Sequence, residues 1–161
     1  MDTATNESDL SNTALQPKKH QVRIDHETFH VESQHMLGDA LLSFVGKKAC
    51  AFELIEVFKD EGQNNVVLPD EVVDLDARGL KGFITAHKEL VTIWINDVAK
   101  EVQRGLRSVA ELLALAGAAP DTHILLQEKN GQPPLPMPAN LPVEISGCEV
   151  FFVQVQSGGS S

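Results

Sequence analysis

The residues whose types best suit chemistry lie near the C-terminal end, where Gly158 and Gly159 follow an apolar run and precede Ser160 and Ser161. A glycine pair has no β-carbons, so it can lie extended in a channel too narrow for any side chain and bring a carboxylate to a buried nucleophile. The pattern therefore predicts a protein whose own C-terminus is a substrate. Ser-Gly-Gly-Ser-Ser is also typical of an unstructured terminus or a linker, so the body in front of it must distinguish the two interpretations.

Two further groups of residues have reactive side chains, but neither has the spacing of a known site. His26, His30 and His35 suggest a metal site, yet no cysteine or carboxylate completes a ligand set, so we interpret them as surface histidines. Cys50 and Cys148 lack C-x-x-C spacing and a histidine partner, so we expect two small apolar side chains in the core rather than a nucleophile or a disulfide framework. We predict no metal, no cofactor and no catalytic residue.

The composition is typical of a soluble acidic protein. Of the 161 residues, 42% are hydrophobic, which is enough to bury a core, and the net charge of -10 argues against binding to nucleic acid or an anionic membrane. No apolar run approaches the roughly 20 residues of a membrane span, and the first residues lack the layout of a secretion signal. Two cysteines fit a reducing compartment, so we expect a cytoplasmic protein.

The first 20 residues differ in composition from the rest of the chain. Apart from Leu10 and Leu15 they contain almost no large apolar side chains, so burial cannot offset the entropy lost on ordering. We predict that residues 1–20 are a disordered arm. Its role is either that of a spacer or docking tail or that of an inert extension, and composition favours the extension.

From Gln21 onward the sequence reads as two copies of one unit. Placing Val22 on Ile93 sets an offset of 71 residues (93 - 22), which then falls to 70 and to about 69, where Phe83 meets Phe152. The offset of 71 also aligns Val31 with Val102, Leu41-Leu42 with Leu112-Leu113, Gly46 with Gly117 and Leu54-Ile55 with Leu125-Leu126. Because matched apolar positions at a fixed period indicate a repeat, we predict two domains, 21–87 and 90–155, followed by a flexible tail, 156–161.

The two copies share one order of predicted elements. Each begins with a hairpin, whose turn we place at 25–27 in the first copy and at 96–97 in the second. A helix follows. In the second copy Ser108 and Glu111 have capping-box spacing, Gly117 ends the helix, and the apolar stripe is Val109, Leu112, Leu113 and Ala116. In the first copy Gly46 ends the helix and the stripe is Leu37, Leu41, Phe44 and Val45.

Three more segments complete each copy. Strands are predicted at 52–58 and 123–128, and Asn130-Gly131 is a hairpin signal after the second of these. Residues 65–68 form a short edge strand, whereas the proline-rich stretch 132–138 can be no more than an edge or a loop. Each copy closes on an apolar strand, at 82–86 or 150–155.

Hairpin, helix, strand, short strand and final strand are the elements of a β-grasp unit, in which one helix covers a mixed sheet. The predicted fold class is therefore α+β, with two tandem β-grasp domains. This order, the helix segment 111–117 and the terminal Gly158-Gly159 resemble the bacterial multiubiquitin and ubiquitin-like modifier family, and more closely the two-domain modifiers of bacterial ubiquitin-like conjugation operons. The resemblance covers residues 21–159.

The resemblance implies a protein modifier that does no chemistry itself. In that family an E1-like enzyme adenylates the terminal glycine, which passes to an E2-like enzyme and then to target proteins. Carried over, Gly159 is the residue activated and Gly158 is its neighbour. Ser160 and Ser161 follow the pair, which implies that a deubiquitinase-like metalloprotease first cleaves after Gly159. By resemblance, the role is antiviral defence in a bacterium.

Other functions remain open at this point. The chain could be a non-conjugated tandem β-grasp adaptor that binds partners through its sheets, or a β-grasp sulfur carrier, although such carriers resemble a single unit. Trp94 stands in an outward register between Ile93 and Ile95, and we expect it to pack between the two units rather than against a partner. The acidic surface fits docking on basic E1 and E2 surfaces.

Overall fold

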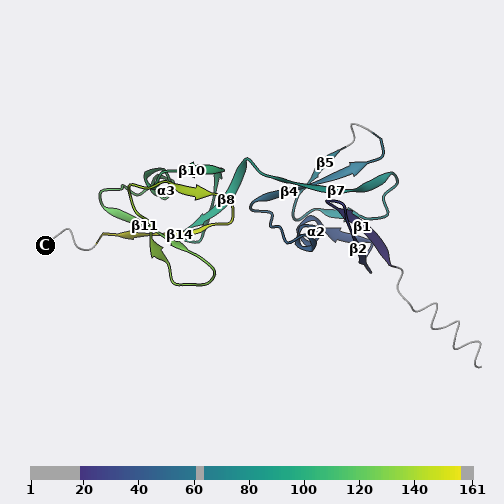
Figure 1. Cartoon of the computed structure of the whole chain (residues 1–161), viewed down its shortest axis with the longest axis horizontal. Coiled ribbons are helices and arrows are strands. Elements are labelled where there is room, and N and C mark those ends of the chain that lie inside the picture. Colours follow the sequence, from purple (N-terminus) through teal and green to yellow (C-terminus); the bar gives the residue numbers. More distant parts are fainter. Residues whose placement is uncertain (1–18, 61–63, 157–161) are drawn as a thin grey trace, which may run out of the picture. The chain divides into compact units, whose positions relative to one another are not determined.

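The computed structural model describes residues 19–60 and 64–156, and these form two compact units (Figure 1). Among the described residues, the first unit contains 19–46, 54–60 and 64–85, and the second contains Lys47–Glu53 and 86–156. Lys47–Glu53 follows the helix of the first unit in sequence but makes its contacts in the second. The chain therefore passes between the units after Gly46, after Glu53 and after Thr85.

The first unit is a mixed sheet with one helix (Figure 1). Its elements are β1 (His20–Ile24), β2 (Glu27–Val31), β3 (His35–Leu37), α2 (Gly38–Phe44), β4 (Phe52–Phe58), β5 (Asn65–Val67), β6 (Val72–Asp74) and β7 (Leu80–His87), of which β4 begins and β7 ends among residues of the second unit. The sheet order is β2-β1-β7-β4-β5, and β3 pairs with β6. The strands β1 and β2 are antiparallel, whereas β1 and β7 are parallel.

The second unit repeats this order. Its elements are β8 (Leu90–Ile95), β9 (Val98–Gln103), β10 (Gly105–Arg107), α3 (Val109–Leu115), β11 (His123–Glu128), β12 (Leu135–Pro136), β13 (Val143–Ile145) and β14 (Val150–Val155). The sheet order is β12-β11-β14-β8-β9, which is the order of the first sheet taken from its other edge, and β10 pairs with β13. The prediction of a mixed α+β fold is confirmed.

The turns and helix ends lie where local sequence signals predicted them. Asp25 and His26 have φ of 50° and 73°, and Asn96 and Asp97 have φ of 52° and 65°, so both hairpins turn through a pair of left-handed residues, a conformation that Asn and Asp tolerate well. The capping box at the start of α3 is present, with each partner bonding the other's backbone amide. The proline-rich stretch contributes only the two-residue edge strand β12.

The apolar stripe predicted for the first helix was partly wrong. Leu41 and Leu42 are buried, but Leu37 is 45% exposed and Phe44 is 37% exposed. The reason is that the helix begins one residue later: Leu37 is its N-cap, with an extended backbone, and therefore points off the helix face. Phe44 stacks instead on Phe29 at the edge of the sheet, with ring centroids 5.1 Å apart. In α3, Val109, Leu112 and Leu113 are buried as predicted, whereas the predicted fourth member, Ala116, is exposed at the C-cap.

The final strands of the two units, β7 and β14, also align differently from the prediction. Phe83 pairs with Ile24 across the parallel strands of the first sheet, and Phe151 pairs with Ile95 in the second. Both phenylalanines are buried, whereas Phe152 is only partly buried. Phe83 therefore corresponds to Phe151 and not to Phe152, because the second copy has lost one more residue between its last two strands than the alignment of apolar residues indicated.

Candidate functional site

The strand that precedes the diglycine is held in the middle of its sheet. β14 pairs with β8 on one side, in parallel, and with β11 on the other, antiparallel, from Glu128↔Val150 to His123↔Val155. Its anchor is Phe151, which is fully buried in the core of the second unit. The last described residue, Gln156, still donates its backbone N–H to the Thr122 carbonyl at 2.9 Å. Backbone hydrogen bonds therefore hold the chain in place up to Gln156, the last described residue.

The side chains at the end of this strand face solvent. Gln154, Val155 and Gln156 are exposed, and Val155 is 63% exposed. The predicted conjugation and processing residues Gly158 and Gly159, with the cleavage point before Ser160, lie outside the described residues. What the structure places is thus the base of the tail: a rigid strand that ends in three exposed residues.

The three histidines considered as metal ligands lie on separate elements. His26 is in the β1–β2 turn, His30 is on β2 and His35 is on β3, and all three are exposed. His26 instead lines a surface hollow of the first unit together with Arg23 and Lys81. Within residues 19–60 and 64–156, no group of three His, Cys, Asp or Glu side chains has the geometry to hold a metal ion.

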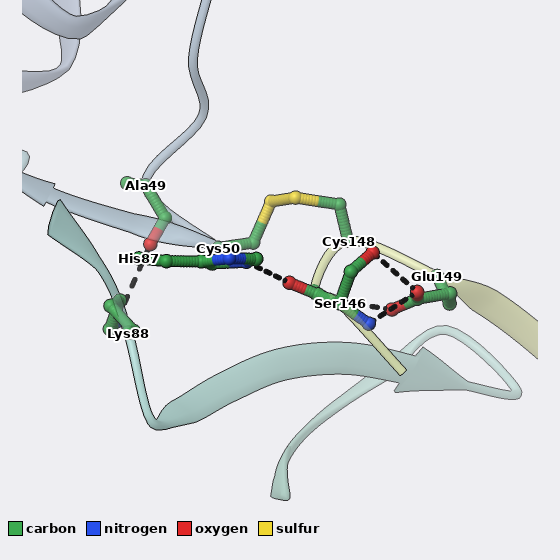
Figure 2. Close-up of a disulfide and its surroundings, with 8 residues drawn as sticks. Ala49, Cys50, His87, Lys88, Ser146, Cys148 and Glu149 are labelled. Atoms are coloured by element: carbon green, nitrogen blue, oxygen red, sulfur yellow. Dashed lines mark hydrogen bonds between the residues drawn. A yellow bond between two sulfur atoms is a disulfide. The ribbon is translucent and has the colours of Figure 1, made fainter. Parts of the chain in front are cut away.

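The prediction that the two cysteines are free core residues was wrong. Cys50 and Cys148 form a disulfide, with Cα atoms 5.2 Å apart (Figure 2). Both residues are only partly buried and both belong to the second unit, Cys50 through the Lys47–Glu53 segment. The two positions are separated by 98 residues, and no spacing rule connects cysteines at that distance, so the sequence carried no signal of the pair.

Glu149 organises the turn that carries Cys148. Its carboxylate accepts hydrogen bonds from the Ser146 N–H at 2.8 Å, the Ser146 hydroxyl at 3.0 Å and the Gly147 N–H at 2.8 Å (Figure 2). Gly147 has φ of 112° and Cys148 has φ of 76°, so the backbone is left-handed at both. A β-carbon at Gly147 would lie 2.7 Å from the Ala51 side chain, so only glycine allows the turn to approach the Lys47–Glu53 segment this closely.

His87 joins the same turn to the segment that carries Cys50. Its ring stacks on Phe52 with centroids 4.6 Å apart, and its Nε2 lies 2.8 Å from the Ser146 carbonyl oxygen (Figure 2). Arg104 lies 3.0 Å from Nδ1 and can only donate, so Nδ1 accepts and Nε2 carries the proton that is donated to Ser146. Arg104 also pairs with Glu89 at 3.3 Å. This chain of contacts holds the His87 ring in place.

The backbone of the Lys47–Glu53 segment is also bound to β8 and its approach. Thr92 donates its N–H to the Cys50 carbonyl at 2.9 Å, and Lys88 donates its N–H to the Ala51 carbonyl at 2.9 Å. The Lys88 ammonium reaches the Ala49 carbonyl at 3.4 Å (Figure 2). The segment is therefore attached to the second unit by a covalent bond, a ring stack and backbone hydrogen bonds.

Trp94 lies in the outward register that the sequence predicts. Along β8, Val91, Ile93 and Ile95 are buried, whereas Thr92 and Trp94 are only partly buried. The Trp94 N–H donates to the Glu149 carbonyl at 2.9 Å, and the residue is paired with Val150. Trp94 is therefore on the face of the second sheet that is opposite its core.

Two carboxyl groups of the described residues have clearly shifted pKa values, and both lie in the first unit. Burial, with repulsion from Glu71 as the second cause, raises the pKa of Glu56. A hydrogen bond from the Gln34 side chain, followed by one from the Asp76 backbone amide, lowers the pKa of Asp74. Neither group lies at the base of the tail.

Comparison with known protein families finds a match to part of the chain. A search of curated proteins found no match to the sequence. No helix among the described residues is long and apolar enough to cross a membrane. A protein-family model described as Multiubiquitin matches residues 20–88, a span that runs from the first residue of β1 to just past the end of β7. The match supports a ubiquitin-like domain over residues 20–88, which is less than half of the chain.

Proposed function

We propose that this protein is a ubiquitin-like modifier with two ubiquitin-like domains in tandem, conjugated to target proteins through Gly159. The chain itself is not an enzyme in this proposal. A deubiquitinase-like metalloprotease removes Ser160 and Ser161, an E1-like enzyme activates the new carboxylate of Gly159, and an E2-like enzyme carries it to the target. A role in bacterial antiviral defence and a cytoplasmic location belong to the same proposal.

The observation that carries the proposal is that β14 runs to Val155 and that Gln156, three residues before Gly159, still donates its backbone N–H to the Thr122 carbonyl. An extended chain spans at most about 3.6 Å per residue, so Gly159 can reach roughly 10 Å from the sheet. Gly158 and Gly159 have no side chains, so the proposal gives them the part of a short, narrow projection. Such a projection suits insertion of a carboxylate into the enclosed site of another enzyme.

The arrangement of the second unit supports the same proposal. The family match ends at residue 88, but the sheet that carries the tail has the strand order of the sheet inside the match. In both units the final strand lies between the first strand, which is parallel to it, and the strand that follows the helix. A second ubiquitin-like domain in front of the diglycine accounts for this repetition.

The chemistry is supplied by the partners. A carboxylate is a poor electrophile, so ATP must first convert it to an acyl adenylate with release of pyrophosphate. A cysteine thiolate of the E1-like enzyme then displaces AMP to give a thioester, which passes to the E2-like cysteine and finally to an amine or hydroxyl of the target. This chain contributes positioning: its domains bind the enzymes, and its tail presents the reacting atom.

The test is intact mass spectrometry after co-expression with E1-like, E2-like and metalloprotease proteins encoded beside the gene. We expect loss of the two C-terminal serines with the protease alone, and covalent adducts when all three partners are present. A chain that ends at Gly159 should form adducts without the protease. Gly159→Phe should abolish adducts while leaving the unfolding transition unchanged.

Two outcomes would contradict the proposal. Adducts that survive Gly159→Phe would show that another group is conjugated. A chain ending at Gly159 that binds the partners but never becomes covalently attached would instead identify a non-conjugated adaptor.

A further inference from the structure

We propose that Cys50 and Cys148 are a thiol–disulfide exchange site, at which a dithiol reductant opens the bond and releases the Lys47–Glu53 segment from the rest of the second unit. The disulfide joins the Lys47–Glu53 segment, which carries Cys50, to the turn that carries Cys148. Other contacts hold the Cys148 turn more firmly than the segment. We therefore expect the segment, and not the turn, to move when the bond is broken.

Neither cysteine of the pair is fully buried in the folded protein. Both cysteines are partly exposed, and Cys148 has a left-handed backbone with φ of 76°, which residues other than glycine seldom adopt. Exposed or strained disulfides are the ones that exchange readily with thiols, whereas buried structural ones resist reduction. These features favour a reversible bond over a permanent one.

The turn around Cys148 does not depend on the disulfide. Glu149 accepts hydrogen bonds from Ser146 and Gly147, and the Cys148 N–H donates to the Thr92 carbonyl at 2.8 Å. The two strands that flank the turn, β13 and β14, are both paired within the second unit. Breaking the sulfur–sulfur bond therefore leaves Cys148 in place.

The Lys47–Glu53 segment has a weaker attachment. It lies in neither sheet except for the first two residues of β4. Cys50 and Ala51 each accept one backbone hydrogen bond, from Thr92 and Lys88, the Lys88 ammonium reaches the Ala49 carbonyl, and Ala51 is buried. The Phe52 ring adds a stack on His87. Without the covalent bond, these contacts alone must offset the conformational entropy that the segment loses when it is ordered. We therefore expect the Lys47–Glu53 segment to move.

The exchange itself follows ordinary disulfide chemistry. A thiolate of the dithiol attacks one sulfur of the pair, giving a mixed disulfide and a free cysteine thiolate. The second thiol of the reductant then displaces the other cysteine. Two electrons and two protons are transferred to Cys50 and Cys148, and the reductant leaves as its own disulfide.

The experiment uses the full chain and dithiothreitol as the dithiol, without denaturant. We expect iodoacetamide to label no cysteine in the oxidised protein and both cysteines after reduction. Amide exchange measured by NMR should become at least about tenfold faster at Thr92 and Lys88, which lose their acceptors, and change less than about twofold at Ser146 and Gly147, which keep theirs.

Matched variants separate the disulfide from general loss of structure. Cys50→Ser/Cys148→Ser should show the exchange pattern of the reduced protein in either buffer. Gly147→Ala places a β-carbon 2.7 Å from Ala51 and should lower the ratio of oxidised to reduced protein by about tenfold or more at a fixed dithiothreitol ratio. Gly131→Ala is the control, because Gly131 is also left-handed but has open space around it, and it should leave that ratio unchanged.

Two results would overturn the proposal. A disulfide that dithiothreitol reduces only after denaturation would be a permanent structural bond. Equal exchange at Thr92 and Lys88 in the oxidised and reduced proteins would show that the segment is held without it.

Discussion

Asp25 and Asn96 make the same contacts at the same place in the two sheets. The Asp25 N–H donates to the Phe83 carbonyl and the Asn96 N–H donates to the Phe151 carbonyl, both at 3.0 Å. The Asp25 side chain accepts the Thr85 N–H at 2.8 Å, and the Asn96 side chain accepts the Val153 N–H at 3.0 Å. Each residue thus turns its own hairpin and attaches that turn to the final strand of its unit.

This double role gives the first prediction. Replacing Asp25 by Ala leaves the partly buried Thr85 N–H without its acceptor. It also places alanine at φ of 50°, where its side chain cannot form the hydrogen bonds that make this conformation tolerable for aspartate. The free energy of unfolding should therefore fall by about 1 to 3 kcal/mol. Asp25→Asn keeps the acceptor and tolerates the backbone, as Asn96 does, and should lose less than half of that. Urea unfolding measures both variants. Equal losses would show that charge, and not the shared geometry, is what matters at this position.

The same pair of residues shows what sequence reasoning can reach. The turns at Asp25 and Asn96, the capping box at Ser108 and the left-handed Gly46 and Gly117 were predicted correctly because each signal lies within a few residues of the structure it forms. The repeat was visible because both units need apolar residues at the same sheet and helix positions. Local chemistry and periodicity were therefore sufficient for the element order.

Features that depend on distant parts of the chain were not predictable in this way. The Cys50–Cys148 disulfide joins residues 98 apart, and only the fold brings them together. The alignment of Phe83 with Phe152 followed apolar type alone, whereas the strand pairing and burial place Phe151 at the position that corresponds to Phe83. Gly158 and Gly159 lie outside the described residues, so their assignment remains a prediction from sequence.

Gly38 carries a second prediction, which runs against helix propensity. Alanine normally stabilises a helical position relative to glycine by about 1 kcal/mol. At Gly38, however, a β-carbon would lie 2.4 Å from the Leu68 carbonyl oxygen, a backbone atom that cannot move aside cheaply. Gly38→Ala should therefore destabilise the protein by about 1 to 3 kcal/mol in urea unfolding. Ser43→Ala, on the exposed side of the same helix, is the control and should change stability by less than about 0.5 kcal/mol.

A third prediction compares the starts of the two helices. Ser108 accepts the Glu111 N–H at 3.0 Å, and Glu111 accepts the Ser108 N–H at 3.3 Å, whereas Leu37 at the start of α2 provides no side-chain hydrogen bond. Ser108→Ala should lower the free energy of unfolding by about 0.5 to 2 kcal/mol. Leu37→Ser supplies the missing acceptor at an exposed position and should act in the opposite direction, by a smaller amount. Thermal unfolding followed by circular dichroism measures both variants. A loss of stability in Leu37→Ser would mean that the Leu37 side chain, next to Val72 in the β3–β6 pair, contributes more to stability than a capping hydrogen bond does.

The fourth prediction concerns Glu56, whose pKa is raised chiefly by burial and then by repulsion from Glu71. A carboxyl with a raised pKa binds its proton more tightly in the folded state, so its ionisation disfavours folding as the pH rises above the range in which the unfolded chain titrates. Glu56→Gln should therefore raise the free energy of unfolding near pH 7 and have little effect near pH 3, where the group is protonated in both states. Because the side chain is partly exposed, the gain in the free energy of unfolding should stay below about 1 kcal/mol.

Two control variants accompany this prediction. Glu71→Gln removes only the second cause and should give a smaller gain with the same pH dependence. Glu32→Gln changes an exposed position beyond β2 and should give no gain. Urea unfolding at the two pH values measures all three variants, and an equal gain for Glu56→Gln at both would show that amide packing, and not the cost of ionisation, is responsible.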